Sequence, residues 1–390
     1  MIRLARENEI AKIRYIWEYC FDDTPEFVDF YFSTCFLPDN TLVFENNRQI
    51  QSCLQLLPYT IFLRCKKFPV SYIVGVATLP EYRGQGVIRL LLKEAGRILE
   101  VRSNYISILL PFQYEFYRKY GWEVCYDLLI YNNIEPPVRH RKSKIISNIE
   151  KGRLRRVNIS NDLTKLNKCN NKFMKRFHGY ILRSSKDWCK VLRDIELDKG
   201  FAYMYECDED TYGYILYTIK DNILTVQELV YMNPETKTAL LQLVYSHMGQ
   251  VSKIRRIAPY WDTEYLLMED ARGRLQKETF VMGRIHNVIG TLTGIPYEGD
   301  DFVIHVYDCF YKENNGCYSV RSYNGTAIVE KVQEKPSICL DINTLTQLLW
   351  GYLPVEVAYN EGFLTSSSEE ALLNLQHMFP MKHNYMSEVY

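Results

Sequence analysis

The spacing of apolar residues changes twice along the sequence and divides it into three blocks. The first block, about 1–135, opens with helical spacing over 5–19 and a helix start at Thr24-Pro25-Glu26. Strand-like runs and further helical spacing alternate after it, which predicts an α/β domain. The expected strands lie at 42–45, 52–58, 60–65, from 71 onward and 105–110, and the expected helices at 88–99 and 113–119.

The second block, about 136–283, repeats the order of the first. A hairpin is expected at 212–219 and 223–230, with its turn at Asp221-Asn222. In both blocks a strand is followed by Pro-Glu and a Leu-rich helix, at Leu79-Pro80-Glu81 and at Asn233-Pro234-Glu235. The glycines that separate Pro-Glu from the helix in the first block are missing from the second. We therefore predict a duplicated α/β unit whose second copy has lost its Gly-rich loop.

The third block, about 284–390, has the pattern of an antiparallel meander. Asn314-Asn315-Gly316 and Asn324-Gly325 are hairpin-turn signals, and helical spacing follows at 343–350 and 368–378. The sequence therefore predicts an α+β protein: two tandem α/β domains, the second degenerate, and then a smaller α+β domain.

Composition and charge narrow the class of protein. The 390 residues carry 47 Lys+Arg and 47 Asp+Glu, and this zero net charge argues against non-specific nucleic-acid binding. A basic stretch at 139–156 is either a solvated linker or a site for an anionic ligand. The 11 cysteines form no C-x-x-C pair and no zinc-type cluster with histidine, so we expect reduced thiols and no metal. Without a signal peptide or an apolar run of ~18 residues, we expect a cytoplasmic protein without membrane contact.

The Gly-rich loop at 83–88 is the clearest chemical feature. It stands between a strand and a helix N-terminus, where free backbone amides and the helix dipole favour an anion. Glycines let backbone N–H groups approach a pyrophosphate closely. The spacing fits neither the P-loop nor the dinucleotide fingerprint. On the residues alone, the loop either binds phosphate or is a structural turn.

The surrounding string V-A-T-L-P-E-Y-R-G-Q-G-V-I-R-L-L-L resembles the acetyl-CoA loop of GCN5-related N-acetyltransferases. Arg83 and Gly86 match its R/Q-x-x-G-x-G/A form, whereas Ile88 departs from the last position. That departure and the three-block order are similar to the Eis-type (enhanced intracellular survival) enzymes. These enzymes have a degenerate central domain and a C-terminal domain similar to sterol carrier protein 2.

The resemblance implies an acetyl-CoA-dependent N-acetyltransferase that acts on a primary amine. The implied substrates are a cationic small molecule, such as an aminoglycoside or a polyamine, or a Lys side chain, with direct attack in a ternary complex. The resemblance also implies a homo-oligomer, a hexamer. Two other functions stay open: a carrier of a lipid or apolar ligand through the third block, and a non-catalytic CoA-binding protein.

The resemblance further implies individual site residues. The form Y-x-x-aromatic-G-aromatic fits 117–122 and places Tyr117 as general acid toward the CoA thiolate, with Tyr120 or a packing role as alternatives. The carboxylate of Tyr390 is implied as general base, with a frayed terminus as the alternative. The cofactor contacts implied are Val76, Ala77, Thr78, Arg83, Gly84, Gln85, Gly86, Val87, Ile88, Arg89, Phe112 and Gln113.

An acidic cluster early in the sequence is a candidate substrate site. Asp22, Asp23, Glu26 and Asp29 lie within eight positions and could attract a cationic amine. The alternative is a solvated helix start, where carboxylates favour the helix dipole.

Overall fold

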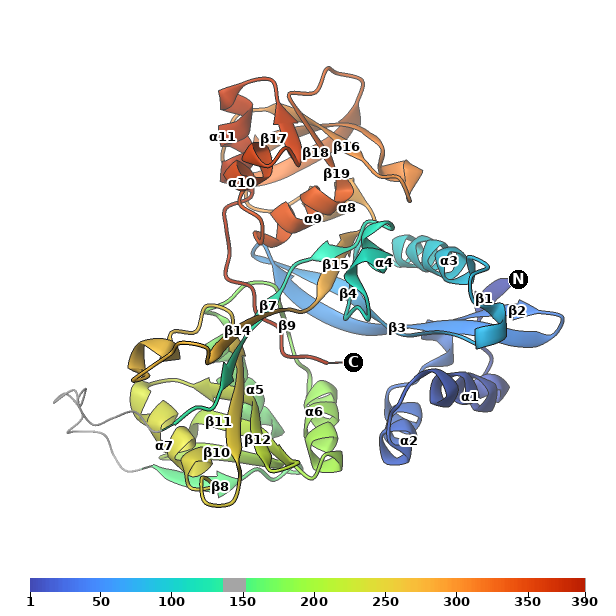
Figure 1. The fold of residues 1–390 in the computed structure, drawn as a ribbon. Coiled ribbons are helices and arrows are strands. Elements are labelled where there is room, and N and C mark those ends of the chain that lie inside the picture. Colours follow the sequence, from blue (N-terminus) through green and yellow to red (C-terminus); the bar gives the residue numbers. More distant parts are fainter. Residues whose placement is uncertain (136–151, 390) are drawn as a thin grey trace.

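Three β-sheets, each with its own helices, make up residues 1–135 and 152–389, which the computed structural model describes (Figure 1). The sheets have eight, seven and five strands. The predicted α+β organisation, with two α/β units ahead of a smaller domain, is confirmed.

The first sheet is flanked by four α-helices. Thr24 caps the second of them by accepting a hydrogen bond from the Phe27 amide, with Pro25 in the first turn, as predicted. The strands are β1 (Ile2–Leu4), β2 (Thr41–Asn46), β3 (Gln49–Leu63), β4 (Lys66–Thr78), β5 (Ile106–Leu109) and β6 (Glu123–Val124). The helices are α1 (Ile10–Cys20), α2 (Pro25–Thr34), α3 (Val87–Val101) and α4 (Tyr114–Arg118), with short 3-10 turns η1 (Glu7–Glu9), η2 (Pro38–Asn40) and η3 (Pro80–Tyr82).

The prediction of separate strands at 52–58 and 60–65 is wrong, because both belong to the single strand β3. The chain turns only at Arg64 and Cys65, which have φ values of +47° and +57°. Neither Gly nor Asn marks this hairpin turn, so the sequence carried no local signal for it.

The second sheet repeats this plan. Its hairpin turns at Asp221-Asn222, both with positive φ, as predicted. Its strands are β7 (Asp127–Asn132), β8 (Arg153–Arg156), β10 (Phe201–Cys207), β11 (Asp210–Lys220), β12 (Ile223–Tyr231), β13 (Lys253–Pro259) and β14 (Leu275–Thr279). Its helices are α5 (Leu163–Met174), α6 (Ser185–Leu197) and α7 (Pro234–Tyr245), followed by the turn η5 (Glu264–Leu267).

The strand orders support the predicted duplication. The order β2-β3-β4-β5 in the first sheet matches β10-β11-β12-β13 in the second, and the last pair is parallel in both. The two units also exchange strands. β7 follows the first unit in sequence but pairs in the second sheet, whereas β15 (Met282–Ile285) pairs with β5 and β6 of the first. The short β9 (Tyr180–Ile181) also pairs with β3.

The third sheet consists of β16 (Phe302–Tyr307), β17 (Gly316–Tyr323), β18 (Thr326–Val332), β19 (Ile338–Asp341) and β20 (Leu364–Ser366). Its helices are α8 (Val288–Leu292), α9 (Ile342–Trp350), α10 (Val355–Asn360) and α11 (Glu369–Met378), with the turn η6 (Lys312–Asn314). The hairpin turn at Asn324-Gly325 is confirmed. The one predicted at Asn314-Asn315-Gly316 is wrong, because both asparagine side chains bind Asp308 and shape a longer loop.

A buried arginine joins the third domain to the first. The Arg284 guanidinium is 2.7 Å from the Asp308 carboxylate and donates a hydrogen bond to the Tyr120 carbonyl. It fills the space beside Gly121, whose φ is +87°. Any side chain at that position would collide with the guanidinium.

We therefore expect Gly121→Ala to lower the free energy of unfolding by about 3 kcal/mol, because backbone strain adds to displacement of a buried charge. Gly362→Ala is the matched control. Gly362 also has positive φ but open space around it, so only about 1 kcal/mol is expected. Denaturant unfolding of the two variants would measure the difference, and equal losses would contradict it.

Candidate functional site

The two parallel strands of the first sheet, β4 and β5, separate toward their C-terminal ends, and the gap between them is here called the fork. β4 and β5 pair as far as Ile73 and Leu109, and β4 then continues to Thr78 paired with β3 only. The register with β3 shifts at this point, opposite Gly75, whose φ is +58°. A side chain on Gly75 would overlap the Trp17 ring. Glycine therefore permits the bend that separates β4 from β5.

The Gly-rich loop lies at the end of this fork. Gly84 and Gly86 both have positive φ, and Gly86 is the N-cap of α3, a helix of 15 residues. Val87 is buried, whereas positions 83–86 and 89 are exposed, so the first amides of α3 are accessible. Arg83 Nε donates to the Thr78 carbonyl at 3.0 Å. This bond ties the loop to β4 and occupies one of the expected cofactor acceptors.

Tyr117 lies beside the loop, on α4. It shares a buried cluster with Val87, and the half-buried Val76 and Ile88 pack against the same cluster. Its ring is 5.7 Å from that of Phe112 and is 3% exposed. Burial raises its pKa, so the phenol keeps its proton at neutral pH. Within the described ranges, no protein group bonds the Tyr117 hydroxyl.

The other expected residues of this region lie around Tyr117. Phe112 is 70% exposed, and Gln113 is the exposed N-cap of α4. The rival Tyr120 instead turns its ring toward Phe310 of the third domain, at 4.9 Å. The fold thus places the strand end 76–78, the loop 83–89, Phe112 and Tyr117 together at the C-terminal ends of β4 and β5.

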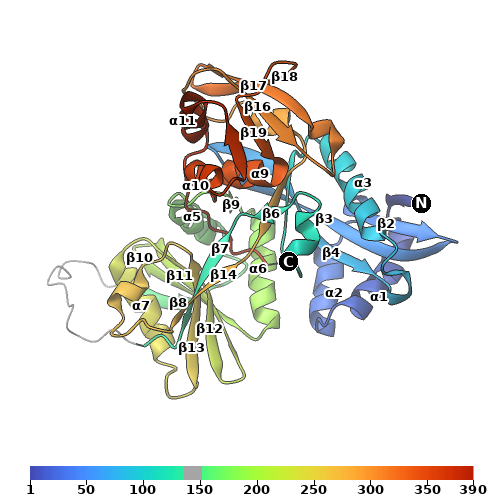
Figure 2. The ribbon, with the colours of Figure 1, turned by 45° about the horizontal axis from the view of Figure 1, so that its top comes forward.

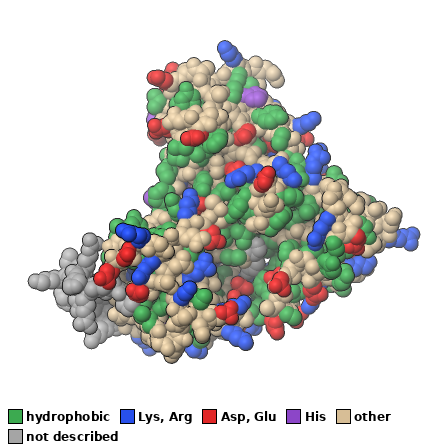
Figure 3. Space-filling model, in the orientation of Figure 1, with side chains coloured by type: hydrophobic (Ala, Val, Ile, Leu, Met, Phe, Trp, Pro, Cys, Tyr) green, Lys and Arg blue, Asp and Glu red, His purple; other side chains and the backbone are tan. Residues whose placement is uncertain are grey.

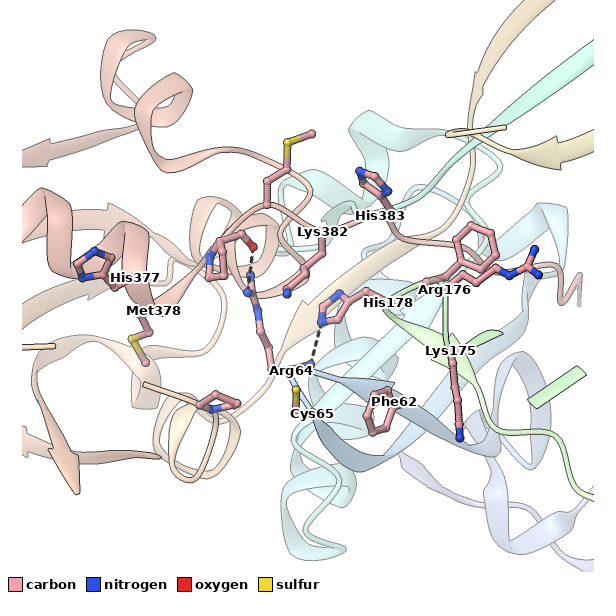
Figure 4. Close-up of a pocket in the computed structure, with 14 residues that line it drawn as sticks. Phe62, Arg64, Cys65, Lys175, Arg176, His178, His377, Met378, Lys382 and His383 are labelled. Atoms are coloured by element: carbon pink, nitrogen blue, oxygen red, sulfur yellow. Dashed lines mark hydrogen bonds between the residues drawn. The ribbon is translucent and has the colours of Figure 1, made fainter. Parts of the chain in front are cut away.

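Residues 379–389, here called the tail, leave the third domain after α11 and pass a cavity of about 460 Å³ (Figure 4). Arg64 donates to the Leu349 carbonyl at 2.7 Å and to the Pro380 carbonyl at 3.0 Å. The His178 ring accepts from the Arg64 amide and bonds Asn384 at 2.9 Å. Burial and the Arg64 charge lower the His178 pKa to about 3, so the ring is neutral.

The tail then enters the space between the first two domains. Glu388, 4% exposed, is 2.8 Å from Arg183 Nε, and Arg183 makes two further bonds to Glu228. Tyr72 on β4 donates to the Glu388 carbonyl at 3.3 Å. Val389 is exposed, and the expected base Tyr390 lies outside the described residues. Figure 2 shows the chain end beside α6 and the first domain.

An acidic pocket of about 360 Å³ adjoins the tail. Its charged lining residues are Asp194 of α6, Asp198 at the C-cap of that helix, Glu228, Glu278, Glu388, Arg183 and Arg255. Burial, and then the charges of Asp198 and Asp23, raise the pKa of Asp194 to about 6. Asp23 of the first domain, whose carboxylate accepts a bond from Trp17 Nε1 at 2.8 Å, is therefore close enough to α6 for its charge to act on Asp194, although it does not line the pocket. Figure 3 shows acidic side chains gathered over α2 and α6.

The other members of the predicted acidic cluster do not line this pocket. Asp22 and Glu26 are exposed, and Asp29 pairs with Arg14 at 2.6 Å. Asp194, Arg183, Glu228 and Glu388 were not predicted from the sequence. The acidic residues of α6 could have been noticed, but no local pattern marks the partners of Arg183.

Residues 1–135 and 152–389 also bear on the expectations about metal binding and membrane contact. No group of three or more His, Cys, Asp or Glu side chains is placed to hold a metal ion there. No helix in these ranges is long and apolar enough to cross a bilayer. The basic stretch predicted at 139–156 lies mostly outside the described residues, and its last part forms β8.

Comparison with protein families assigns all three domains. Residues 1–125 and 179–285 each match an acetyltransferase (GNAT) domain, and residues 288–387 match a sterol carrier protein domain. A search of curated proteins found no match.

Solved structures share the complete fold. A conserved protein of unknown function from Enterococcus faecalis V583 is 21% identical, with a TM-score of 0.88 over 100% of this chain and 99% of its own. A GCN5-related N-acetyltransferase from Anabaena variabilis ATCC 29413 is 21% identical, with a TM-score of 0.83 over all of both chains. Eis1 from Mycobacterium abscessus is 16% identical, with a TM-score of 0.77, also over all of both chains. The protein therefore consists of two GNAT acetyltransferase domains followed by a sterol carrier protein domain, and it shares this three-domain fold with Eis1.

Proposed function

We propose that the protein transfers an acetyl group from acetyl-CoA to a primary amine on a polycationic molecule. The observation that carries this proposal is the acidic pocket that second-domain residues form beside the tail. Burial, and then the charges of Asp198 and Asp23, raise the pKa of Asp194, and a bound cation would stabilise its ionised form.

The fork and the loop fit acetyl-CoA. Gly84 and Gly86 leave open space where a Cβ would stand, so a pyrophosphate can approach the backbone of the loop closely. The free edge of β4 around Val76 can pair with the pantetheine amide as an added strand would. Phe112, largely exposed beside Tyr117, offers an apolar contact at the same edge.

The chemistry is a direct transfer in a ternary complex. The amine nitrogen attacks the thioester carbonyl, a C–N bond forms and the C–S bond breaks. In the proposed roles, the carboxylate of Tyr390 takes the proton of the amine, and the Tyr117 phenol gives its proton to the departing thiolate. The raised pKa of Tyr117 keeps that proton available at neutral pH.

A carrier function through the third domain has less structural support. Trp350 of α9 packs against Gly283 of the first sheet, whereas Leu345, Leu348 and Leu349 of the same helix are fully buried in the protein core. These side chains fill the core that an apolar ligand would need.

The proposal is tested by measuring thiol release from acetyl-CoA with spermidine, a neutral-chain monoamine, an aminoglycoside and a Lys-containing peptide. We expect turnover with the polycations and a higher KM for the monoamine. Absence of turnover with every amine, despite binding of acetyl-CoA, would reject an acetyltransferase of amines and favour a CoA-binding protein.

Tyr117→Phe is expected to lower kcat by roughly 10²- to 10⁴-fold with little change in the KM for acetyl-CoA, because only the proton donor is lost. Tyr120→Phe is the control, since its ring belongs to the same aromatic cluster but faces the third domain. Steady-state kinetics of both variants measure the difference. If Tyr117→Phe and Tyr120→Phe have the same kcat, Tyr117 is not the general acid.

Asp194→Asn is expected to raise the KM for spermidine roughly tenfold at pH 7.5, because a charge-assisted contact is lost. In the unmodified protein this KM should rise as the pH falls through about 6, where Asp194 takes up a proton. The variant should lose that dependence. Glu196→Gln is the control, because Glu196 is an exposed carboxylate of the same helix that pairs with Arg193.

The same substitution should also affect stability. Because the folded-state pKa of Asp194 is raised, the folded protein binds its proton more tightly, and the ionised carboxylate disfavours folding above pH 6. Asp194→Asn should therefore stabilise the protein by about 1 kcal/mol at pH 7.5, after allowance for solvent screening, and have no such effect near pH 4. Thermal unfolding at the two pH values measures this, and a loss of stability at pH 7.5 would contradict it.

A further inference from the structure

The second domain keeps the fork of a GNAT domain but fills it with charged side chains. β12 and β13 pair in parallel only as far as Val226 and Arg256, as β4 and β5 pair as far as Ile73. The register with the preceding strand shifts next to that point in both domains. Gly75 stands two positions beyond the last parallel pair of the first domain, and Glu228 stands at the same place in the second.

Glu228 makes this second fork a binding site for an arginine rather than for a cofactor. Its side chain is 3% exposed and accepts bonds from Arg183 Nη1 at 3.0 Å and Nη2 at 2.8 Å. Tyr214 also donates to the same carboxylate. The Glu228 carboxylate at this fork is therefore bonded on both oxygens by protein groups.

The tail supplies the remaining partners of this arginine. Arg183 Nε bonds Glu388 at 2.8 Å and Arg183 Nη2 bonds Ser387 at 2.9 Å, so the buried guanidinium is shared between two carboxylates. These bonds fix the position of Glu388 strongly, because an unpaired charge in a buried site has a high free energy.

The segment that carries Arg183 is itself fixed to the first domain. β9 pairs with β3, and Gly179 and Leu182 on either side of it donate to carbonyls of β3. His178 at one end of this segment exchanges backbone bonds with the tail at His383 and Tyr385. Arg183 at the other end holds Glu388. One short segment therefore fixes tail residues 383–388 relative to the first sheet, at both ends.

We propose that the degenerate GNAT domain serves as the receptor of the tail, and that Arg183 is a positioning residue that sets the reach of Tyr390 into the acyl-transfer site. This inference rests on the function proposed above, in which the Tyr390 carboxylate is the base. Arg183 lines the acidic pocket, and the proposed positioning role acts through its bond to Glu388. In this proposal the second domain lacks the loop for a cofactor and instead positions the last residues of the chain.

Glu388→Gln tests the inference with the least damage, because Arg183 and Glu228 remain a balanced pair when the tail charge is removed. We expect kcat to fall by roughly 10- to 100-fold, with the KM for acetyl-CoA unchanged, since a misplaced group costs rate rather than cofactor affinity. Glu388→Asp keeps the charge with a shorter arm and should give an intermediate kcat. Combining Glu388→Gln with deletion of Tyr390 should lower kcat no further than the deletion alone.

Glu264→Gln is the matched control. Arg256 is another buried arginine of the second domain that is shared between two carboxylates, Asp262 and Glu264, and neither belongs to the tail. This variant should change the melting temperature at least as much as Glu388→Gln while leaving kcat unchanged. A parallel loss of kcat in both variants would show a general effect of stability and overturn the positioning role.

The outcomes separate this inference from the proposed function. Unchanged kcat in Glu388→Gln and Glu388→Asp, with turnover abolished by deletion of Tyr390, would overturn the tail receptor and leave the base in place. Unchanged kcat after deletion of Tyr390 would reject the Tyr390 carboxylate as the base. It would also reject the proposed role of the second domain in positioning that carboxylate. A Glu388→Gln variant that loses its fold is replaced by Glu388→Asp, for which a kcat equal to that of the unmodified protein overturns the inference.

Discussion

Burying the Arg183 guanidinium is costly unless its carboxylate partners are in place, and this constraint couples three distant parts of the chain. Glu228 belongs to the second sheet, Glu388 to the tail, and the Arg183 segment is bonded to the first sheet. The position of the tail is therefore decided together with the packing of the first two domains. The exchange of β7 and β15 between their sheets reinforces that packing, because neither sheet is complete without a strand from the other part of the sequence.

The two GNAT domains show how one fork can serve two purposes. In the first, Gly75 allows β4 to bend away, and the loop at 83–86 presents backbone amides at the start of α3. In the second, Glu228 stands at the place of Gly75, and α7 starts at Asn233-Pro234 without a Gly-rich loop. Loss of the loop removes the phosphate contacts, and gain of a buried carboxylate creates a site for Arg183.

The acidic pocket arises from the same arrangement. Its carboxylates come from the second domain and, with Glu388, from the tail, and the charge of Asp23 in the first domain also acts on Asp194. The third domain contributes by a different route. It delivers the tail past Arg64 and His178, and Arg284 with Asp308 holds it against the turn that follows Tyr117.

The sequence by itself determined features whose physical cause is local. The cap at Thr24, the turns at Asp221-Asn222 and Asn324-Gly325, and the Gly-rich loop before α3 each depend on residues a few positions apart. The order of the three domains followed from hydrophobic spacing and from resemblance. These signals were enough to place the expected cofactor contacts and Tyr117 at the C-terminal ends of β4 and β5.

Only the tertiary structure decided the strand exchange, the turn at Arg64-Cys65, the approach of Asp23 to Asp194 and the binding of Glu388 by Arg183. The reason is distance along the chain. Arg183 and Glu388 are 205 positions apart, and a buried ion pair between them has no spacing that a local pattern could reveal. Hydrophobic periodicity reports which face of an element is buried, whereas the partner of that face is fixed only when the whole chain is packed.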